Sequence, residues 1–179
     1  MNKKKPLIIS GFGGIGKTTL ANKYSNVIDL ESSKYQYVYP EPTTQEEYEK
    51  LKANQNREIN PEYPKNYVEA IKDAMTKYDV ICVRYNSYKN PNFLDTYGFD
   101  YVVCYPTKKA FKKYYIQRFR DRGNTEEFIE VLQRYHNLCC EISKKTRKKI
   151  ILREDETLED ALIKKGVELI PRENSHSQS

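Results

Sequence analysis

Gly11-Phe12-Gly13-Gly14-Ile15-Gly16-Lys17-Thr18 is the segment from which the fold of this chain can be worked out. It fits the spacing G-x-x-x-x-G-K-[ST], and it lies between an apolar run at residues 6–10 and a helical pattern at residues 16–24. Glycines in such a turn let consecutive backbone amides point inward around a polyphosphate, and the start of the next helix adds its positive dipole end. The alternative is a flexible turn that matches by chance. The flanking strand and helix favour a phosphate-binding loop.

This loop predicts which residues contact a bound nucleoside triphosphate. Lys17 would reach the β- and γ-phosphates, Thr18 would coordinate Mg²⁺, and Thr19 would contact the α-phosphate. The expected donor-binding residues are Gly11, Gly13, Gly14, Ile15, Gly16, Lys17, Thr18 and Thr19. We prefer ATP over GTP only because the sequence lacks a convincing N-K-x-D run that would read guanine.

Outward from the loop, short apolar runs alternate with helical patterns. Strands are predicted at residues 6–10, 27–30, 79–83, 100–105 and 149–152, and helices at residues 16–24, 43–54, 66–78, 107–122, 124–145 and 157–165. Thr43 or Thr44 would cap the helix at 43–54, and Asn124 with Glu127 would cap the helix at 124–145. Such alternation predicts an α/β fold with a mainly parallel sheet covered on both faces.

Composition and charge exclude several classes of protein. The 179 residues suffice for one domain, and the longest apolar runs are far shorter than the roughly 20 residues that a bilayer requires, so no membrane helix is expected. The four cysteines have the spacing of neither a zinc site nor a disulfide framework, which predicts reduced, buried thiols in a cytoplasmic protein. The net charge of +6 is concentrated at residues 108–122 and 144–149, a pattern typical of an anion site or of solvated helix surface.

Two acidic side chains follow the second predicted strand. Asp29 and Glu31 alternate along this strand, which aims both to one side. Ligands bind at the carboxyl ends of strands beside such a loop. We therefore expect Asp29 to hold magnesium or to accept a proton, and Glu31 to face the acceptor. Two acids in a solvated turn are the alternative.

Arg84 ends the third predicted strand, where an acid that holds magnesium would usually stand. Because this strand would lie beside the loop, Arg84 is a candidate for binding the phosphate of an acceptor. A structural pairing with Asp95 or Asp100 is the alternative.

Arginines on the helix at 107–122 can stabilise a phosphoryl group in transfer. Arg118 and Arg122 are four residues apart and share one face of the helix, whereas Arg120 points elsewhere. An apolar seam lets the same helix dock on the protein through Phe111, Tyr115 and Phe119. Arg118 and Arg122 are therefore predicted to act in catalysis, on a lid that closes over bound phosphates. A basic surface helix is the alternative.

The polar segment at residues 31–66 is where we expect an acceptor to be recognised. Tyr63 and Arg57 are its candidate binding residues, because a tyrosine ring can stack on a base and an arginine can hold a phosphate. Each tyrosine could equally belong to the core or the surface, since the chain has 16 of them.

Together, these features resemble the P-loop nucleoside monophosphate kinase group, above all its small phage-type or prophage-type members related to thymidylate and deoxynucleotide kinases. The likeness rests on the phosphate loop, the acidic pair, Arg84 and the R-x-R-x-R-G run of residues 118–123, and it extends from about Leu7 to Leu152. The acidic pair is also similar to that of shikimate-type kinases. Arg84 lacks the preceding aspartate of thymidylate kinases, and no base-reading sequence is recognisable.

The resemblance implies a three-layer P-loop NTPase fold, with a five-stranded parallel sheet in the order 2-3-1-4-5 and a helical lid. It implies transfer of the γ-phosphoryl group of ATP, with Mg²⁺, to a nucleoside monophosphate. Carried over by position, Gly11 to Thr19 would bind the donor, Asp29 the metal or acceptor, Arg84 the acceptor, and Arg118 and Arg122 the transfer zone. The expected organisation is one domain at residues 1–170, with an acceptor insertion at 31–66 and a lid region at 107–125, followed by a flexible tail at 171–179.

Two other functions stay open. The acidic pair also suits a kinase that phosphorylates a hydroxyl of a small metabolite, a nucleoside or a nucleic-acid end. The missing acid at the end of the third strand suits a non-catalytic ATP-binding regulator. A small-molecule nucleotide is the expected partner, nucleic acid is less favoured, a membrane is not expected, and a homodimer is left open.

Overall fold

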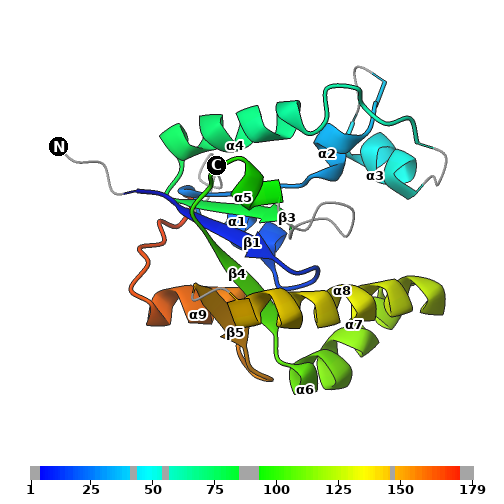
Figure 1. Ribbon diagram of the computed structural model, residues 1–179, viewed down its shortest axis with the longest axis vertical. Coiled ribbons are helices and arrows are strands. Elements are labelled where there is room, and N and C mark those ends of the chain that lie inside the picture. Colours follow the sequence, from blue (N-terminus) through cyan, green and yellow to red (C-terminus); the bar gives the residue numbers. More distant parts are fainter. Residues whose placement is uncertain (1–4, 41–43, 54–56, 85–92, 146–147, 174–179) are drawn as a thin grey trace, which may run out of the picture.

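A parallel sheet between two layers of helices forms the body of the protein (Figure 1). The computed structural model describes residues 5–40, 44–53, 57–84, 93–145 and 148–173. The strands are β1 (Leu7–Gly11), β2 (Val27–Leu30), β3 (Val80–Arg84), β4 (Tyr101–Pro106) and β5 (Lys149–Leu152). Their order is β2-β3-β1-β4-β5 and every pairing is parallel, so the predicted α/β fold and strand order are confirmed.

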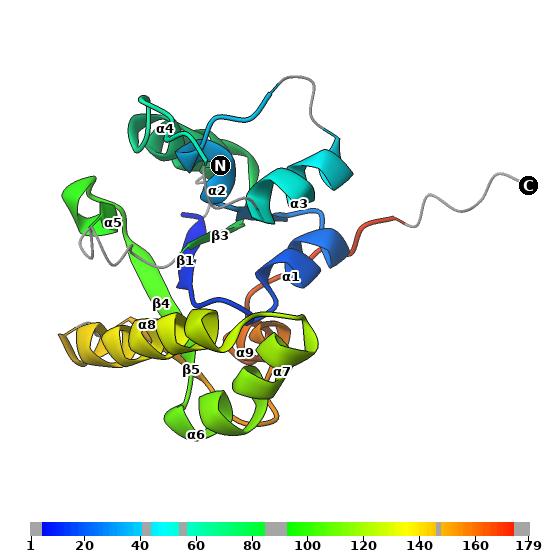
Figure 2. The same ribbon diagram turned by 90° about the vertical axis from the view of Figure 1, so that its right-hand side faces the viewer.

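Helices cover both faces of this sheet. The helices are α1 (Lys17–Lys23), α2 (Ser33–Gln36), α3 (Gln45–Ala53), α4 (Lys65–Lys77), α5 (Phe93–Thr96), α6 (Lys108–Ala110), α7 (Ile116–Asp121), α8 (Glu126–Lys145) and α9 (Leu158–Lys164), with a π-helical turn η1 (Phe111–Tyr115) between α6 and α7. Residues of α4 and α5 form one core with one face of the sheet, whereas α1, α8, α9 and the lid region form the other. Figure 2 shows α5 and α1 on opposite sides of β1. Ile8 and Ile9 alternate between these two cores, as neighbours on a strand must.

The lid region differs from the single helix that the sequence predicts. It is divided into α6, η1 and α7, and the N–H of Ile116 donates to the carbonyl of Phe111, five residues earlier. The region ends at Gly123, as expected: Gly123 N–H donates to Arg120 and Asn124 N–H to Phe119, which together form a Schellman motif. Short helices α2 and α5 were not predicted.

Helix starts agree with the sequence in one case and differ in another. Thr44 caps α3 through reciprocal hydrogen bonds with Glu47. The predicted cap at Asn124 is wrong: Thr125 accepts from Phe128 N–H at 3.3 Å and caps α8, while the Asn124 amide donates to the carbonyl of Phe119 in the preceding helix.

The cysteines Cys82, Cys104 and Cys139 are buried free thiols, and Cys140 is half-buried. In the described residues, every helix is too short or too polar to cross a bilayer.

The chain beyond α9 is anchored by one buried side chain. Asn26 donates from its amide to Asp79 and to the carbonyl of Glu168, both at 2.9 Å, and accepts from the N–H of Ile170 at 2.9 Å. Pro171 pairs with Tyr24, so the start of the predicted tail is held in place, and residues 174–179 lie outside the described part. Asn26 thereby joins the start of β2, the start of β3 and the C-terminal segment.

Replacing Asn26 by alanine should lower the free energy of unfolding by about 1–2 kcal/mol, because it removes three hydrogen bonds that a buried side chain makes to residues at the surface. Urea denaturation of the variant and the parent measures this difference. Asn22→Ala is the matched control: Asn22 is exposed on α1, and its replacement should change stability by less than about 0.5 kcal/mol. Equal effects of the two substitutions would contradict the anchoring role.

His136 is a second buried polar side chain, and its charge state should affect stability. It is 1% exposed, stacks on Phe111 with 4.4 Å between the ring centroids, and shares a 2.7 Å hydrogen bond between Nε2 and the carbonyl of Pro106. Burial lowers the pKa of His136, although the Pro106 carbonyl acts in the opposite direction. The folded protein therefore binds this proton less readily than the unfolded chain does.

Stability should accordingly fall as the pH drops from about 7 towards 5, a range above the titration of ordinary carboxylates. One proton limits the slope to about 1.4 kcal/mol per pH unit. Denaturation at several pH values tests this, and His136→Gln, whose amide can still donate to Pro106, should flatten the slope. A slope shared by both proteins would assign the effect to other groups.

Candidate phosphate-transfer site

The predicted phosphate loop connects the carboxyl end of β1 to α1. Gly14 has a φ of +77°, a conformation that favours glycine. A Cβ on Gly11 would lie 2.8 Å from Cδ1 of Ile15 and 2.9 Å from Cδ of Lys17, so the loop closes too tightly there for any side chain. Phe12 and Ile15 are buried in the core, 2% and 4% exposed, and hold the loop to the body of the protein.

Lys17 is folded back along this loop. Its ammonium donates to the carbonyl oxygens of Phe12 at 2.8 Å and of Gly11 at 3.2 Å. The side chain is partly buried and has no carboxylate partner among the described residues. The positive charge is thus held at the loop by two weak acceptors, which an anionic phosphate oxygen can replace.

Thr18 and Asp29, the two residues predicted to hold magnesium, are in contact. The hydroxyl of Thr18 donates to Oδ2 of Asp29 at 2.7 Å, which links the start of α1 to the end of β2. Mg²⁺ prefers oxygen ligands and is bound in nucleotide sites by one or two protein oxygens together with phosphates. The described residues hold no cluster of three or more His, Cys, Asp and Glu side chains for a metal. The donor set therefore fits a magnesium ion that arrives with a nucleotide.

The lid region docks directly on the loop. A Cβ on Gly14 would lie 3.1 Å from Cζ of Phe119 and 3.7 Å from Cδ1 of Tyr115. Both aromatic side chains belong to the predicted apolar seam, and both are 5% exposed. Arg118 lies between them in sequence, and its guanidinium stands 5.2 Å from the centroid of the Tyr115 ring. The structure thus places Arg118 next to a residue that contacts the loop.

The other two arginines of the lid region are in different surroundings. Arg120 forms two hydrogen bonds with the carboxylate of Glu126, at 2.7 and 2.9 Å, and so connects α7 to α8. This agrees with its predicted orientation away from the site. Arg122 is exposed at the end of α7, and its role in catalysis stays a prediction.

Arg84 stands among tyrosines at the carboxyl end of β3. Its guanidinium lies 5.9 Å from the centroid of the Tyr135 ring on α8. Burial raises the pKa of Tyr63, and the charge of Arg84 opposes this rise. The alternative pairing with an aspartate is absent: Asp95 accepts from Tyr101, and Asp100 pairs with two lysines, Lys5 and Lys148.

Tyr67 holds the backbone beneath Arg84. It is 2% exposed, its hydroxyl donates to the carbonyl of Leu30 at 2.8 Å, and the same oxygen accepts from the N–H of Arg84 at 3.2 Å. Burial raises the pKa of this phenol strongly, so it stays protonated. The ends of β2 and β3 are therefore held in a fixed relation, with Asp29 on one and Arg84 on the other.

Glu31 and other candidate acceptor residues lie in the insertion at residues 31–66, which follows β2. Tyr48 of α3 is buried at 6% exposure, shares a 2.7 Å hydrogen bond with Ser33, and lies near Glu31, whose charge helps burial to raise the pKa of Tyr48. Arg57 is partly buried, with its guanidinium 3.9 Å from the centroid of the Tyr37 ring. The candidate acceptor residues thus all lie on the β2–β3 side of the loop.

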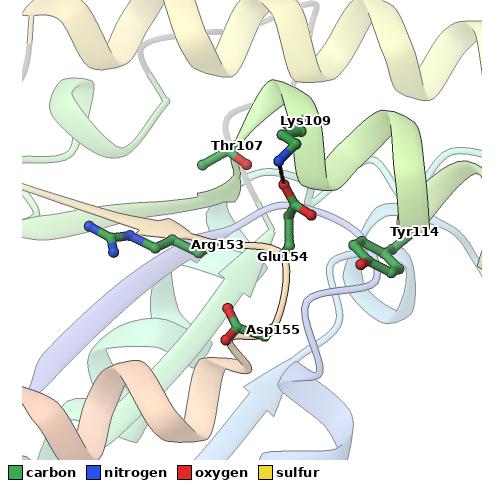
Figure 3. A pocket seen from close by; sticks show the side chains of 6 residues that line it. All are labelled: Thr107, Lys109, Tyr114, Arg153, Glu154 and Asp155. Atoms are coloured by element: carbon green, nitrogen blue, oxygen red, sulfur yellow. Dashed lines mark ion pairs between the residues drawn. The ribbon is translucent and has the colours of Figure 1, made fainter.

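A shallow hollow of about 640 Å³ lies on the opposite side of the loop (Figure 3). It is lined by Thr107, Lys109, Tyr114, Arg153, Glu154 and Asp155. Because β4 and β5 continue the sheet next to β1, the loops that follow them share its carboxyl edge with the phosphate loop. Glu154 pairs with Lys109 (Figure 3) and also with Lys113, which connects the loop after β5 to the lid region.

Sequence reasoning missed Tyr135, Tyr67 and the lining of this hollow. Arg153 directly follows the last strand, and the rule that ligands bind at carboxyl ends of strands would have found it. No sequence signal marks Tyr135 as a site residue, because in the sequence it is one member of the apolar stripe of a long helix.

Comparison with known proteins identifies a fold but no family. No profile of a known protein family matches the chain, and no curated protein sequence matches it. Eight chains of solved structures match. One is the tunicamycin resistance protein of Deinococcus radiodurans, with 12% sequence identity and a TM-score of 0.51 over 94% of this chain and 100% of that one.

A likeness at such low identity shows the fold alone. It agrees with the strand order, the phosphate loop and the two helical layers found here, as the resemblance implied. The nucleoside monophosphate kinase group and its phage-type members gain no support from this comparison. The chain therefore has a P-loop kinase-like α/β fold, which it shares with that resistance protein.

Proposed function

We propose that the protein transfers the γ-phosphoryl group of ATP to a nucleoside monophosphate, with a deoxynucleotide as the preferred acceptor. The observation that carries the proposal is the contact between Thr18 and Asp29, because it brings a hydroxyl and a carboxylate together beside Lys17. These three groups are what a magnesium-bound triphosphate requires. The P-loop kinase-like fold supports phosphotransfer in general, and the acceptor is inferred from the side chains around Arg84.

At the donor end, the loop amides and Lys17 would hold the β- and γ-phosphates. Lys17 would exchange the carbonyls of Gly11 and Phe12 for phosphate oxygens. The hollow beside Tyr114 is the proposed place for the nucleoside, because it shares the sheet edge with the loop and has an aromatic ring and polar groups to orient a base (Figure 3). Magnesium, held by Thr18 and Asp29, would neutralise charge on the phosphates when bound.

At the acceptor end, Arg84 would grip the phosphate that receives the new group. The backbone of Arg84 is fixed by Tyr67, so its guanidinium extends from a rigid base. Tyr135, whose ring lies beneath the guanidinium, and Tyr63, which packs on Tyr67, would offer aromatic surfaces for a base or sugar. Arg118 would complete the site from the lid, where its charge can stabilise the phosphoryl group during transfer.

A second candidate is phosphorylation of a hydroxyl group. It is favoured by the position of Asp29 at the end of β2, because a carboxylate there can take the proton that an attacking hydroxyl gives up. A phosphate acceptor needs no such base, because its oxygens are already ionised and release no proton when they attack. Labelled γ-phosphate on a nucleoside or sugar hydroxyl, with no transfer to any monophosphate, would decide for this candidate.

Lys17→Ala should weaken binding of Mg²⁺–ATP about 100-fold and abolish transfer, because the charge that holds the β- and γ-phosphates is removed. Calorimetry with ATP, and ADP formation in the presence of a panel of ribo- and deoxynucleoside monophosphates, measure the two effects. Lys72→Ala, on the exposed face of α4, is the control and should change neither. ATP turnover that survives in Lys17→Ala would refute the assignment of the loop; ATP binding without transfer to any acceptor would indicate a regulator.

Asp29→Asn should lower the rate of transfer about 100-fold or more and weaken the affinity for Mg²⁺–ATP by a smaller factor, about 10-fold or less, because Thr18 and the phosphates still hold the ion. Asparagine can still accept the hydrogen bond from Thr18, so the geometry is kept and only the charge is lost. Single-turnover transfer and calorimetry separate the two quantities. Asp73→Asn, exposed on α4, serves as control. An unchanged rate in Asp29→Asn would remove Asp29 from the reaction.

A further inference from the structure

Two buried donors on the insertion have no hydrogen-bond partner. They are Nε of Arg57 and the hydroxyl of Tyr39, each buried at the atom while the residue as a whole is partly exposed. A buried polar group without a partner costs free energy, and nearly all such groups in folded proteins are paired. Two of them close together therefore call for an explanation.

Arg57 and Tyr39 stand at the end of a short antiparallel pairing. Tyr37 is bridged to Ile59, Val38 N–H donates to Glu58 at 3.0 Å, and Asn60 N–H donates to Gln36 at 2.9 Å. Continued by two residues, this register sets Tyr39 opposite Arg57. Paired residues on neighbouring strands point to the same face, so both unpartnered groups lie on one side of the pairing.

The chemistry of the two groups selects the ligand. The Nε of an arginine can only donate, the guanidinium is always charged, and a phenol donates as well. Most surface lysines of the described chain have carboxylate partners, as in Lys50–Glu46 and Lys77–Asp73, whereas Arg57 is stacked on a neutral ring. An anionic oxygen is the acceptor that would satisfy both groups together.

This anion position is separate from Arg84. Arg57 stacks on Tyr37, whereas the backbone N–H of Arg84 donates to Tyr67, whose ring packs against Tyr63. The two guanidiniums thus lie over different tyrosines, Tyr37 for Arg57 and Tyr135 for Arg84. A single phosphate at Arg84 would leave the donors of Arg57 and Tyr39 unused.

We propose that Arg57 and Tyr39 form a second anion subsite, and that the acceptor is a nucleotide with two phosphate groups. This inference rests on the proposed function for the class of molecule, and it adds a requirement of its own. The phosphate that accepts the transferred group is bound at Arg84, the nucleoside lies along Tyr63 and Tyr37, and the second phosphate is bound at Arg57 and Tyr39. A nucleoside 3′,5′-bisphosphate, or the 5′-phosphorylated end of an oligonucleotide, carries phosphates in this arrangement.

The test is a binding measurement on full-length Lys17→Ala protein, in which the phosphate loop no longer competes for the probes. Calorimetry compares four deoxynucleoside 5′-monophosphates with the matching 3′,5′-bisphosphates and with 5′-phosphorylated dinucleotides. We expect the best bisphosphate or dinucleotide to bind about 10-fold tighter than its monophosphate or better. A preference for the bisphosphate alone identifies a small molecule, and an equal preference for the dinucleotide identifies a strand end.

Further substitutions in the Lys17→Ala protein test which residues cause the tighter binding of the bisphosphate. Arg57→Gln should bring the ratio of affinities close to one, and Tyr39→Phe should reduce it about threefold. Arg172→Gln, remote on the C-terminal segment, is the matched control and should leave the ratio unchanged. Tyr39→Phe should also leave the unfolding free energy equal to that of its parent or higher, because its hydroxyl has no partner to lose.

Several results would overturn the subsite. They are equal affinity for mono- and bisphosphates in the parent, absence of binding by every probe, a preference that survives Arg57→Gln, or a marked loss of stability in Tyr39→Phe. None of them depends on turnover. Failure of the wild-type protein to transfer phosphate from ATP would instead count against the proposed function and leave the affinity ratio as it stands.

Discussion

The close approach of the lid region to the phosphate loop is the constraint on which the site depends. A Cβ on Gly14, whose φ is +77°, would lie 3.1 Å from Cζ of Phe119 and 3.7 Å from Cδ1 of Tyr115, so the aromatic side chains of the lid region pack closely on the loop. The loop is therefore held from two directions: β1 fixes its start through the sheet, and the aromatic seam fixes its middle. Arg118 lies between these two aromatic residues in sequence, with its guanidinium 5.2 Å from the centroid of the Tyr115 ring, so the contact that holds the loop also positions the segment that carries Arg118.

The π-helical turn lies within the same aromatic seam. Phe111, Tyr115 and Phe119 follow one another at intervals of four residues, which keeps all three on one broad face of a helical segment, and all three are buried. The turn η1 covers the first of these intervals, Phe111–Tyr115. The break in the predicted helix therefore adjoins the candidate site, where such turns are frequent.

The fold and the donor end could be predicted because their signals are local. The glycine spacing identifies the loop, and alternation of strands and helices identifies the sheet. The contact of Thr18 with Asp29 follows because Thr18 lies in the first turn of the helix after the loop and Asp29 lies at the carboxyl end of β2, at the same edge of the sheet. Tyr135 could not be found in this way. It is one position in a 20-residue helix, and only the tertiary packing decides which turn of α8 reaches Arg84. The pairing of Tyr37 with Ile59 could not be predicted either, because a polar segment has no alternating hydrophobic pattern that would set the register of two strands.

The two ends of the site differ in how well they are satisfied without ligands. At the donor end, Lys17 is held by two carbonyls and Asp29 by Thr18, so an arriving phosphate must exchange existing hydrogen bonds for new ones. At the proposed acceptor end, Nε of Arg57 and the hydroxyl of Tyr39 are buried without partners, so an anion that reached them would add hydrogen bonds without replacing existing ones. Removing the cost of unpaired buried groups favours binding more than exchange does. Discrimination between ligands should therefore be strongest at the acceptor end, because a molecule lacking the second anionic group would leave that cost in place.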